Sequence, residues 1–316
     1  MRFLIEGEEE IGSRSLAAFL RAHRDELTAD LVVSADGAMW RPSEPSIPMA
    51  SKGLLALDIT VTGPASDLHS GRHGGAVQNP LHALAWILSS LHEANGRVAV
   101  AGFYDVRPLT ARERESLAVV PFDEETYREE VGVQALHGEP EFTTLERLWA
   151  RPTLEVNGIA GGGWFTVIPH RARARVSCRL VPEQHPDAIF NAIREHVGEL
   201  CPPGVEVAVE SEPGAVSAYA IPSDHPAVQA ALRALRDVYL DREPLLVRIG
   251  GTLPAATLFE EILGLKTLLF SFSIADEHLH APNEFFRLDR IHDGMRAWAA
   301  LWVLLAGIAE PGSLVR

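Results

Sequence analysis

The stretch Glu6-Gly-Glu-Glu-Glu-Ile-Gly-Ser13 is the part of the sequence around which the rest of the chain can be organised. An apolar run, 3–5, precedes it and a helical pattern, 15–27, follows it, which predicts a buried strand, a tight acidic turn and a helix. Carboxylates crowded at the carboxyl end of a strand repel one another unless a cation offsets their charge, as a divalent metal ion does. The alternative is a solvated acidic turn that complements the dipole of the following helix.

Composition and charge limit the class of protein. The chain has 316 residues, of which 47% are hydrophobic and 22% charged, which is enough for two globular domains with separate cores. The net charge of -15 argues against a nucleic-acid partner or an anionic membrane surface. The only cysteines are Cys178 and Cys201, which indicates no disulfide framework and predicts a cytoplasmic protein. We expect no signal peptide and no membrane span, because acidic residues begin at Glu6 and the apolar stretch 295–308 is short.

The hydrophobic pattern changes character twice along the chain. Short apolar strands and helical patterns, typical of an α/β domain, occur near both chain ends, at 31–34, 227–239, 245–248, 267–271 and 288–308. The middle of the chain predicts further strands and two main helices, at 53–62, 81–94, 97–102, 152–156, 172–181, 186–200 and 205–210. Residues 109–151 are charged and mostly helical, and Pro42, Pro45 and Pro48 mark a linker. We therefore infer one α/β domain made of the two chain ends, with an α+β domain inserted between them.

Four polar clusters lie where the predicted strands end: 8–10, Asp36, 250–252 and 278–284. Open α/β sheets place their sites at the carboxyl ends of strands, and Glu, Asp and His together suit a zinc or manganese ion. Each cluster has a structural alternative, since Asp36 before Gly37 fits a turn and an isolated histidine fits an exposed loop. Their joint placement favours a metal site.

Eight short words of the sequence occur in the order in which one enzyme family carries them. They are Glu6–Ser13, Ser34–Gly37, Asp67–Gly75 with Asn79-Pro80, Asn157–Gly162, Thr166–Pro169, Arg179–Pro182, Gly250–Pro254 and His280–Glu284. In this order the chain resembles the co-catalytic metallopeptidases. These include carnosinase-like and cytosolic nonspecific dipeptidases, acetylornithine deacetylase, succinyl-diaminopimelate desuccinylase and carboxypeptidase G. The words at 67–75 and 222–225 are most similar to the dipeptidase branch.

The resemblance implies catalytic and metal-binding roles for individual residues. Glu9 would be the general base, Glu10 and His280 would bind one metal ion, and Asp36 would bind the other. His69 would reach the active site of a partner subunit and stabilise the tetrahedral oxyanion. As a structural alternative, His69 fits a loop in which the backbone satisfies its ring.

Further matching positions would bind the substrate. The resemblance implies this role for Arg179, His225, Gly251, Thr252 and Asn157, with Arg179 and the Gly251-Thr252 turn holding the substrate's carboxylate. An arginine fork matches two carboxylate oxygens, which makes this role chemically coherent. Arg179 also fits an exposed strand position, and Asn157 before Gly158 also fits a turn.

The same resemblance implies an architecture, a cofactor and partners. Residues 1–50 and 217–316 would form an α/β/α catalytic domain, and 51–216 an inserted ferredoxin-like α+β domain that serves as lid and dimerisation domain. The cofactor would be Zn²⁺, with Mn²⁺ or Co²⁺ as alternatives. The substrate would be a dipeptide or an N-acyl amino acid, cleaved by a homodimer.

The sequence departs from the family upstream of the acidic turn. The family's His-x-Asp word and its metal-bridging Asp both precede that turn, so the resemblance implies a catalytic domain that is incomplete at its N-terminus. Without the bridging carboxylate, two dications about 3.5–4 Å apart would repel each other. We expect at most one bound metal ion and impaired hydrolysis. The alternatives are an inactive remnant that dimerises or binds a ligand, a peptide-binding protein, and a deacylase or carboxypeptidase in the full-length form.

Overall fold

The structure is a computed structural model that describes residues 1–316 except 43, 275, 280, 309–313, 315 and 316. The chain divides into two compact units. Unit 1 consists of Met1–Lys52, Leu109–Phe122 and Tyr219–Arg316, and unit 2 of Gly53–Pro108 and Asp123–Ala218. The predicted domains differ from this grouping at 109–122, which the sequence placed in the inserted domain. This segment holds α4 (Ala111–Ala118), which belongs with unit 1 because Glu113 forms an ion pair of 2.9 Å with Arg248.

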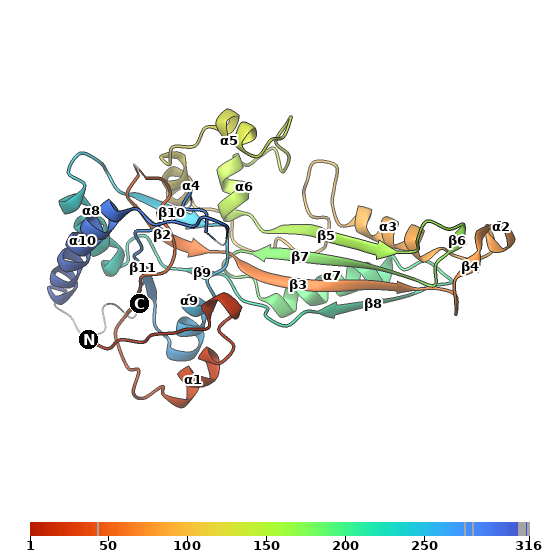
Figure 1. The fold of residues 1–316 in the computed structure, drawn as a ribbon, viewed down its shortest axis with the longest axis horizontal. Coiled ribbons are helices and arrows are strands. Elements are labelled where there is room, and N and C mark those ends of the chain that lie inside the picture. The colour runs from red at the N-terminus through yellow and green to blue at the C-terminus, as the bar shows by residue number, and fades with distance from the viewer. Residues whose placement is uncertain (43, 275, 280, 309–313, 315–316) are drawn as a thin grey trace. The chain divides into compact units, whose positions relative to one another are not determined.

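Unit 2 has the ferredoxin-like topology predicted from the sequence, and the mixed α/β class is confirmed. Along the chain it contains β3 (Gly53–Thr62), α3 (Pro80–Ser90), β5 (Thr153–Gly161), β7 (Arg171–Leu180), α7 (Pro186–Glu199) and β8 (Glu206–Ser211). The sheet order is β5-β7-β3-β8, and every neighbouring pair is antiparallel. The strands therefore lie in the order second, third, first, fourth, as in the split βαβ arrangement (Figure 1).

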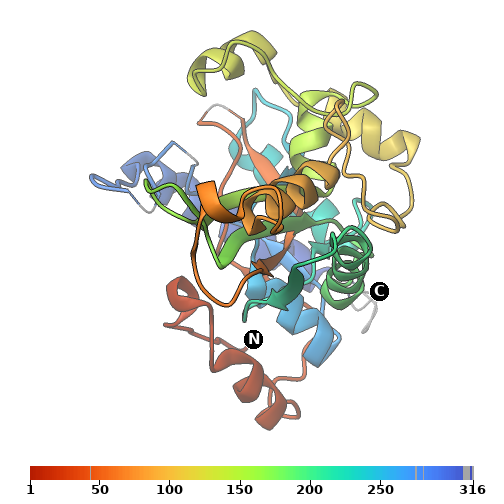
Figure 2. The same ribbon diagram turned by 90° about the vertical axis from the view of Figure 1, so that its right-hand side faces the viewer.

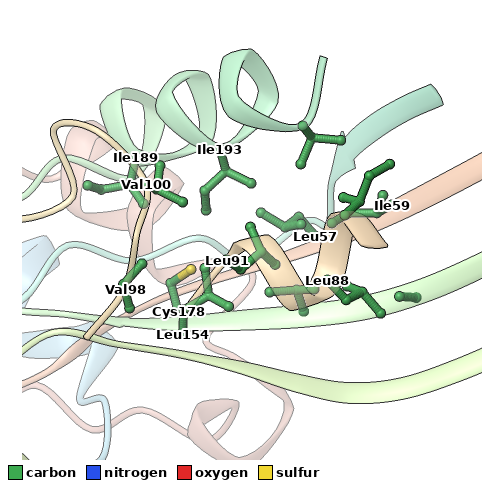
Figure 3. Packing of buried hydrophobic residues seen from close by; sticks show 14 of the residues in the cluster. Leu57, Ile59, Leu88, Leu91, Val98, Val100, Leu154, Cys178, Ile189 and Ile193 are labelled. Carbon is green, nitrogen blue, oxygen red and sulfur yellow. The ribbon is translucent and has the colours of Figure 1, made fainter. Parts of the chain in front are cut away.

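The core of unit 2 explains why buried and less buried residues alternate along its strands. In β3, Leu57 and Ile59 are fully buried, and Asp58 between them is half-buried. These side chains pack against Leu88 of α3 and Ile193 of α7, so both helices cover one face of the sheet (Figures 2 and 3). Burying each such side chain contributes about 1.5–3 kcal/mol, which makes this face the main source of stability in unit 2.

Two segments of unit 2 differ from their predicted boundaries. Helix α3 begins at Pro80 because Asn79 Oδ1 accepts the Leu81 N–H at 2.9 Å and proline suits the first helical position. The predicted strand at 97–102 is wrong, since the structure gives it only an isolated bridge between His92 and Val98. The Val98 N–H instead donates to the Tyr104 hydroxyl at 3.0 Å, so this segment packs on the core without joining the sheet.

The remaining elements of unit 2 are short. They are β4 (Leu68–His69), α2 (Ser70–His73), α5 (Glu124–Glu130), α6 (Thr144–Ala150) and β6 (Val167–Ile168). Strands β4 and β6 pair antiparallel, and the tip that they form with α2 faces the viewer in Figure 2. Helices α5 and α6, together with α4 of unit 1, account for the charged helical segment predicted at 109–151.

Unit 1 contains two ladders of strands and helices that pack on them. A parallel pair joins β1 (Val32–Ser34) to β11 (Thr267–Leu269). In a second ladder, β2 (Ser46–Ser51) is parallel to β10 (Leu245–Ile249) and antiparallel to β9 (Tyr219–Ala220). The other elements are η1 (Glu9–Ile11), α1 (Leu16–Ala22), α8 (Pro226–Val238), α9 (Pro254–Leu258), the π-helical turn η2 (Phe259–Leu263) and α10 (Leu288–Ala306). Among the described residues, no helix combines the length and the apolar character that crossing a membrane requires.

Two predictions for unit 1 are wrong. The prolines that predicted a linker flank or lie inside β2, which is buried throughout. Pro48 is tolerated because the register of the β2–β10 ladder shifts just beyond its partner Val247. The apolar run 3–5 forms no strand and is exposed, with Phe3 at 83% and Ile5 at 92% of their full accessibility. An apolar run needs a neighbouring ladder to satisfy its backbone, and the structure pairs these residues with none.

Candidate functional site

The acidic turn at the start of the chain is built around Glu8. Its carboxylate accepts the Ser15 N–H at 2.9 Å and the Ser15 hydroxyl, and these hydrogen bonds lower the pKa of Glu8. Glu8 therefore fastens the beginning of α1, as the structural alternative for this turn predicts. Glu9 is half-buried and Glu10 is exposed, so the turn presents these two carboxylates differently.

Asp36 lies where β1 and β11 end side by side. The ladder continues past the strands, because the Phe270 N–H donates to Ser34 O at 2.8 Å and the Met39 N–H donates to Ser273 O at 2.9 Å. Asp36 thus lies at a carboxyl edge shared with the segment that leads toward 276–284. Its Oδ1 also accepts the Gly37 N–H at 2.6 Å, so the turn role weighed for Asp36 is present as well.

The segment after β11 is organised by Glu277, which the sequence interpretation missed. This carboxylate is fully buried and accepts the Ile274 N–H at 3.0 Å and the Arg287 N–H at 3.2 Å. The Arg287 guanidinium forms ion pairs with both Glu277, at 3.3 Å, and the exposed Asp276, at 2.8 Å. In the sequence, the two adjacent acidic residues Asp276 and Glu277, directly before His278, were the pattern that could have indicated this clamp, in which Arg287 pairs with both carboxylates.

The segment after β11 contains two histidines, His278 and His280. His278 is exposed, has a left-handed backbone with φ 57°, and its ring lies 5.7 Å from that of Phe285. His280, the predicted metal ligand, lies outside the described residues.

The predicted metal donors have suitable chemistry but are only partly described. Two carboxylates and an imidazole form a donor set that zinc accepts. The structure describes the carboxylates, Glu10 and Asp36, and both are exposed. Within the described part of the chain, no group of three or more His, Cys, Asp or Glu side chains is placed to hold a metal ion. The described residues therefore do not assemble the centre by themselves, and the metal-binding roles stay predictions.

The substrate residues predicted in unit 1 occupy two turns. His225 caps α8: its Nδ1 accepts the Ala227 N–H at 3.2 Å and its Nε2 donates to Leu314 O at 3.1 Å. Burial lowers the pKa of His225, which keeps the ring neutral. Gly251 and Thr252 form the turn between β10 and α9, where Gly251 O accepts the Lys52 N–H at 2.9 Å. His225 and Gly251 thus have structural contacts, and the role of His225, Gly251 and Thr252 toward substrate stays a prediction.

The substrate residues predicted in unit 2 lie in its sheet. Arg179 of β7 stands opposite Leu54 and Thr153, is half-buried, and alternates with buried neighbours on the core side. Asn157 is exposed at a bulge of β5, where the register shifts between Val156 and Gly158. Asn-Gly pairs favour irregular backbone, which is consistent with a bulge here, and a bulge changes the direction in which nearby side chains point.

His69 occupies the short strand β4. Its ring Nδ1 accepts the Gly71 N–H at 3.1 Å, as the backbone-satisfied alternative predicts, while the rest of the ring is exposed. Beside it, His170 Nδ1 and Asp67 Oδ1 are hydrogen-bonded at 2.7 Å. The sequence words included Asp67 but not its partner, because His170 follows the Thr166–Pro169 word and lies 103 positions from Asp67.

The predicted residues thus fall into two groups. Unit 1 holds Glu9, Glu10, Asp36, His225, Gly251 and Thr252, and unit 2 holds His69, Asn157 and Arg179. The parallel β1–β11 pair brings Asp36 beside the strand that leads to residues 276–284, here called the histidine segment.

Comparison with known proteins supplies the family. Residues 49–205 match the peptidase dimerisation domain. The chain is 29% identical over 315 residues to human Beta-Ala-His dipeptidase, and the match covers 97% of this chain and 62% of that protein. It is 30% identical over 314 residues to the Cys-Gly metallodipeptidase dug1 of Schizosaccharomyces pombe, covering 96% of this chain and 66% of that protein. The chain therefore spans just under two thirds of the length of these two relatives.

A solved structure agrees with the sequence comparison. The M20 family metallo-carboxypeptidase Sso-CP2 from Sulfolobus solfataricus matches with a TM-score of 0.82 and 30% sequence identity, over 95% of this chain and 69% of that chain. Sequence and fold thus agree over almost all of this chain. The chain belongs to the M20 family of metallopeptidases.

Proposed function

We propose that this protein is a metal-dependent hydrolase of the dipeptidase type, which cleaves a peptide or amide bond next to a free carboxylate. The M20 relatives named as dipeptidases support this proposal. The observation that carries it is the β1–β11 ladder, whose continuation to Met39 and Ile274 places Asp36 beside the strand leading to the histidine segment. A shared carboxyl edge is where such folds gather their polar side chains.

The proposed roles follow the chemistry of each side chain. Glu10, Asp36 and His280 would hold a zinc ion, with Mn²⁺ or Co²⁺ as alternatives. Such an ion supplies acidification of a water molecule and polarisation of a carbonyl when bound. Glu9 is the proposed general base, because a positioned carboxylate can take a proton from a water molecule.

The substrate's carboxylate and the partner subunit define the rest of the proposal. Arg179, Gly251 and Thr252 are the proposed carboxylate contacts, with Asn157 and His225 as further substrate residues. The match to a peptidase dimerisation domain supports a homodimer that assembles through unit 2, with His69 acting toward the partner's site. Cys178 and Cys201 are both free, which supports a reducing compartment such as the cytoplasm.

A substrate panel tests the function. We expect hydrolysis of at least one dipeptide or N-acyl amino acid with added zinc, manganese or cobalt, and its loss with a chelator. Glu9→Gln should lower kcat by about 10²–10⁴-fold, the usual contribution of a general base. The exposed Asp30→Asn, a carboxylate of the same unit to which no role is assigned, is the matched control.

The panel also distinguishes the alternatives. A folded chain that cleaves no substrate with any of the three metals would contradict the hydrolase proposal and favour a binding or dimerising protein. Preference for N-acyl amino acids or for longer peptides would assign a deacylase or a carboxypeptidase instead. The impaired hydrolysis expected from the sequence stays a prediction, and the measured kcat decides it.

A further inference from the structure

At the tip of unit 2, His69 belongs to a two-stranded ladder that is too short to be stable without further contacts. Strands β4 and β6 pair through only two registers, Leu68 with Ile168 and His69 with Val167. Even a complete two-stranded hairpin is marginally stable in water, so the position of His69 depends on what fastens the ends of this ladder.

One end of the ladder is fastened by Ser70. Its N–H and its hydroxyl both donate to Thr166 O, at 2.9 and 2.8 Å. These two bonds continue the pairing by one position beyond His69.

The other end is fastened by Asp67 and His170. Asp67 Oδ1 accepts both the His170 N–H, at 2.9 Å, and the proton on His170 Nδ1, at 2.7 Å. The carbonyl oxygen of His170 accepts the Gly63 N–H at 2.8 Å, immediately after β3 ends. The pair therefore ties β4 to β6 and to the main sheet of unit 2.

The ring of His69 has a defined tautomer. Because Nδ1 uses its lone pair to accept the Gly71 N–H, a neutral ring must carry its proton on Nε2. A Cβ atom on residue 71 would lie 3.0 Å from Cε1 and 3.3 Å from Nδ1 of His69, closer than most real contacts. Glycine at 71 therefore leaves room for the ring in this orientation.

We propose that Asp67, His170 and Gly71 are positioning residues for His69. The Asp67–His170 pair holds the strand in place, and the Gly71 amide makes Nε2 the proton donor. This inference rests on the proposed function, in which His69 stabilises the negative charge that develops on oxygen during hydrolysis. Such a donor acts only when it is aimed at the oxyanion.

The first test measures the ring directly by NMR of the ¹⁵N-labelled full chain at neutral pH. We expect His69 Nδ1 to appear unprotonated and Nε2 protonated. In Gly71→Ala we expect a mixture of tautomers. In Asp67→Ala and His170→Ala we expect shifted or broadened His69 resonances. Asp67→Asn keeps an oxygen acceptor for the His170 N–H and should restore them in part. A proton on Nδ1 of the unsubstituted chain, or unchanged His69 resonances in all three disruptive variants, overturns the proposal whatever the activity.

The second test is kinetic and uses a double-mutant cycle. Asp67→Ala should lower kcat about tenfold with little change in KM, because misplacing a donor by about 1 Å can cost up to about 10²-fold. In a His69→Ala background the same substitution should cost nothing further. Equal losses in both backgrounds would overturn the proposal.

A matched control and the NMR readout separate this inference from the function itself. Glu212→Ala removes an ion pair of 2.7 Å to Arg175 on the same sheet and should leave the His69 resonances and kcat unchanged. If His69→Ala leaves kcat intact while the NMR results hold, the role of His69 in hydrolysis fails and its positioning stands.

Discussion

At the scale of single residues, two of the histidines predicted to act in the site, His69 and His225, each accept a backbone N–H. His69 and His225 lie in different units, yet each accepts an N–H two residues ahead on Nδ1 and so caps a helix. The words of the sequence identified both positions, but they could not show the ring contacts. Those contacts depend on local backbone geometry in one case and on Leu314, 89 positions away, in the other.

The buried His225 predicts how stability depends on pH. Its pKa is lowered by burial from an ordinary value of 6.5, so the unfolded chain binds a proton more readily than the folded one. The resulting stabilisation is present above pH 6.5 and is lost as the pH falls through the folded pKa. Urea unfolding at pH 7.5 and at successively lower pH should show this loss. His225→Asn, which keeps a capping side chain without a titrating group, should reduce the slope below pH 6.5. An unchanged slope would contradict the assignment.

At the scale of elements, the sequence predicted best those segments in which apolar and polar residues alternate because one face is buried. The strand expected at 53–62 is β3 residue for residue, because its alternation reflects one buried face. Strand β2 was missed because its prolines resemble a linker, and tertiary burial overrides that local signal. The exposed run 3–5 shows the converse, since apolar composition predicts a strand only where a neighbouring strand is available to pair.

The segment 276–287 allows a matched test of buried and exposed ion pairs. Arg287 binds the buried Glu277 and the exposed Asp276. Glu277→Ala should lower the free energy of unfolding by about 2–4 kcal/mol, because it leaves the Ile274 and Arg287 N–H groups without their acceptor. Asp276→Ala should cost at most about 1 kcal/mol, as exposed pairs do. Denaturant titration of both variants checks this, and equal costs would show that Glu277 is not the clamp.

At the scale of the whole molecule, the chain consists of two units, each with its own core. The change of hydrophobic pattern predicted an inserted domain, since antiparallel strands alternate where buried parallel strands do not. It could not predict that 109–122 belongs with the terminal segments, because the Glu113–Arg248 ion pair joins residues 135 positions apart. The proposed metal site combines residues from distant parts of the chain, and the described structure shows the position of Asp36 at the carboxyl ends of β1 and β11.

The proposed homodimer gives a prediction for the intact chain. Sedimentation equilibrium should give about twice the chain mass of 34.5 kDa. Because each chain carries a net charge of -15, raising the salt concentration should strengthen the association by screening the repulsion between copies. A monomeric mass at every protein and salt concentration would contradict the homodimer.

The β1–β11 ladder also constrains how the protein is made. Gly37 and Ser273, which the ladder's continuation joins, are 236 positions apart. A ribosome that adds about 5–20 residues per second would need roughly 10–50 s to supply the second strand after the first has emerged. During that interval the whole of unit 2 leaves the exit tunnel and is free to fold, while β1 waits without a partner. The edge that carries Asp36 can therefore form only after β11 has emerged, and β1 is exposed to chaperones for the whole of that interval.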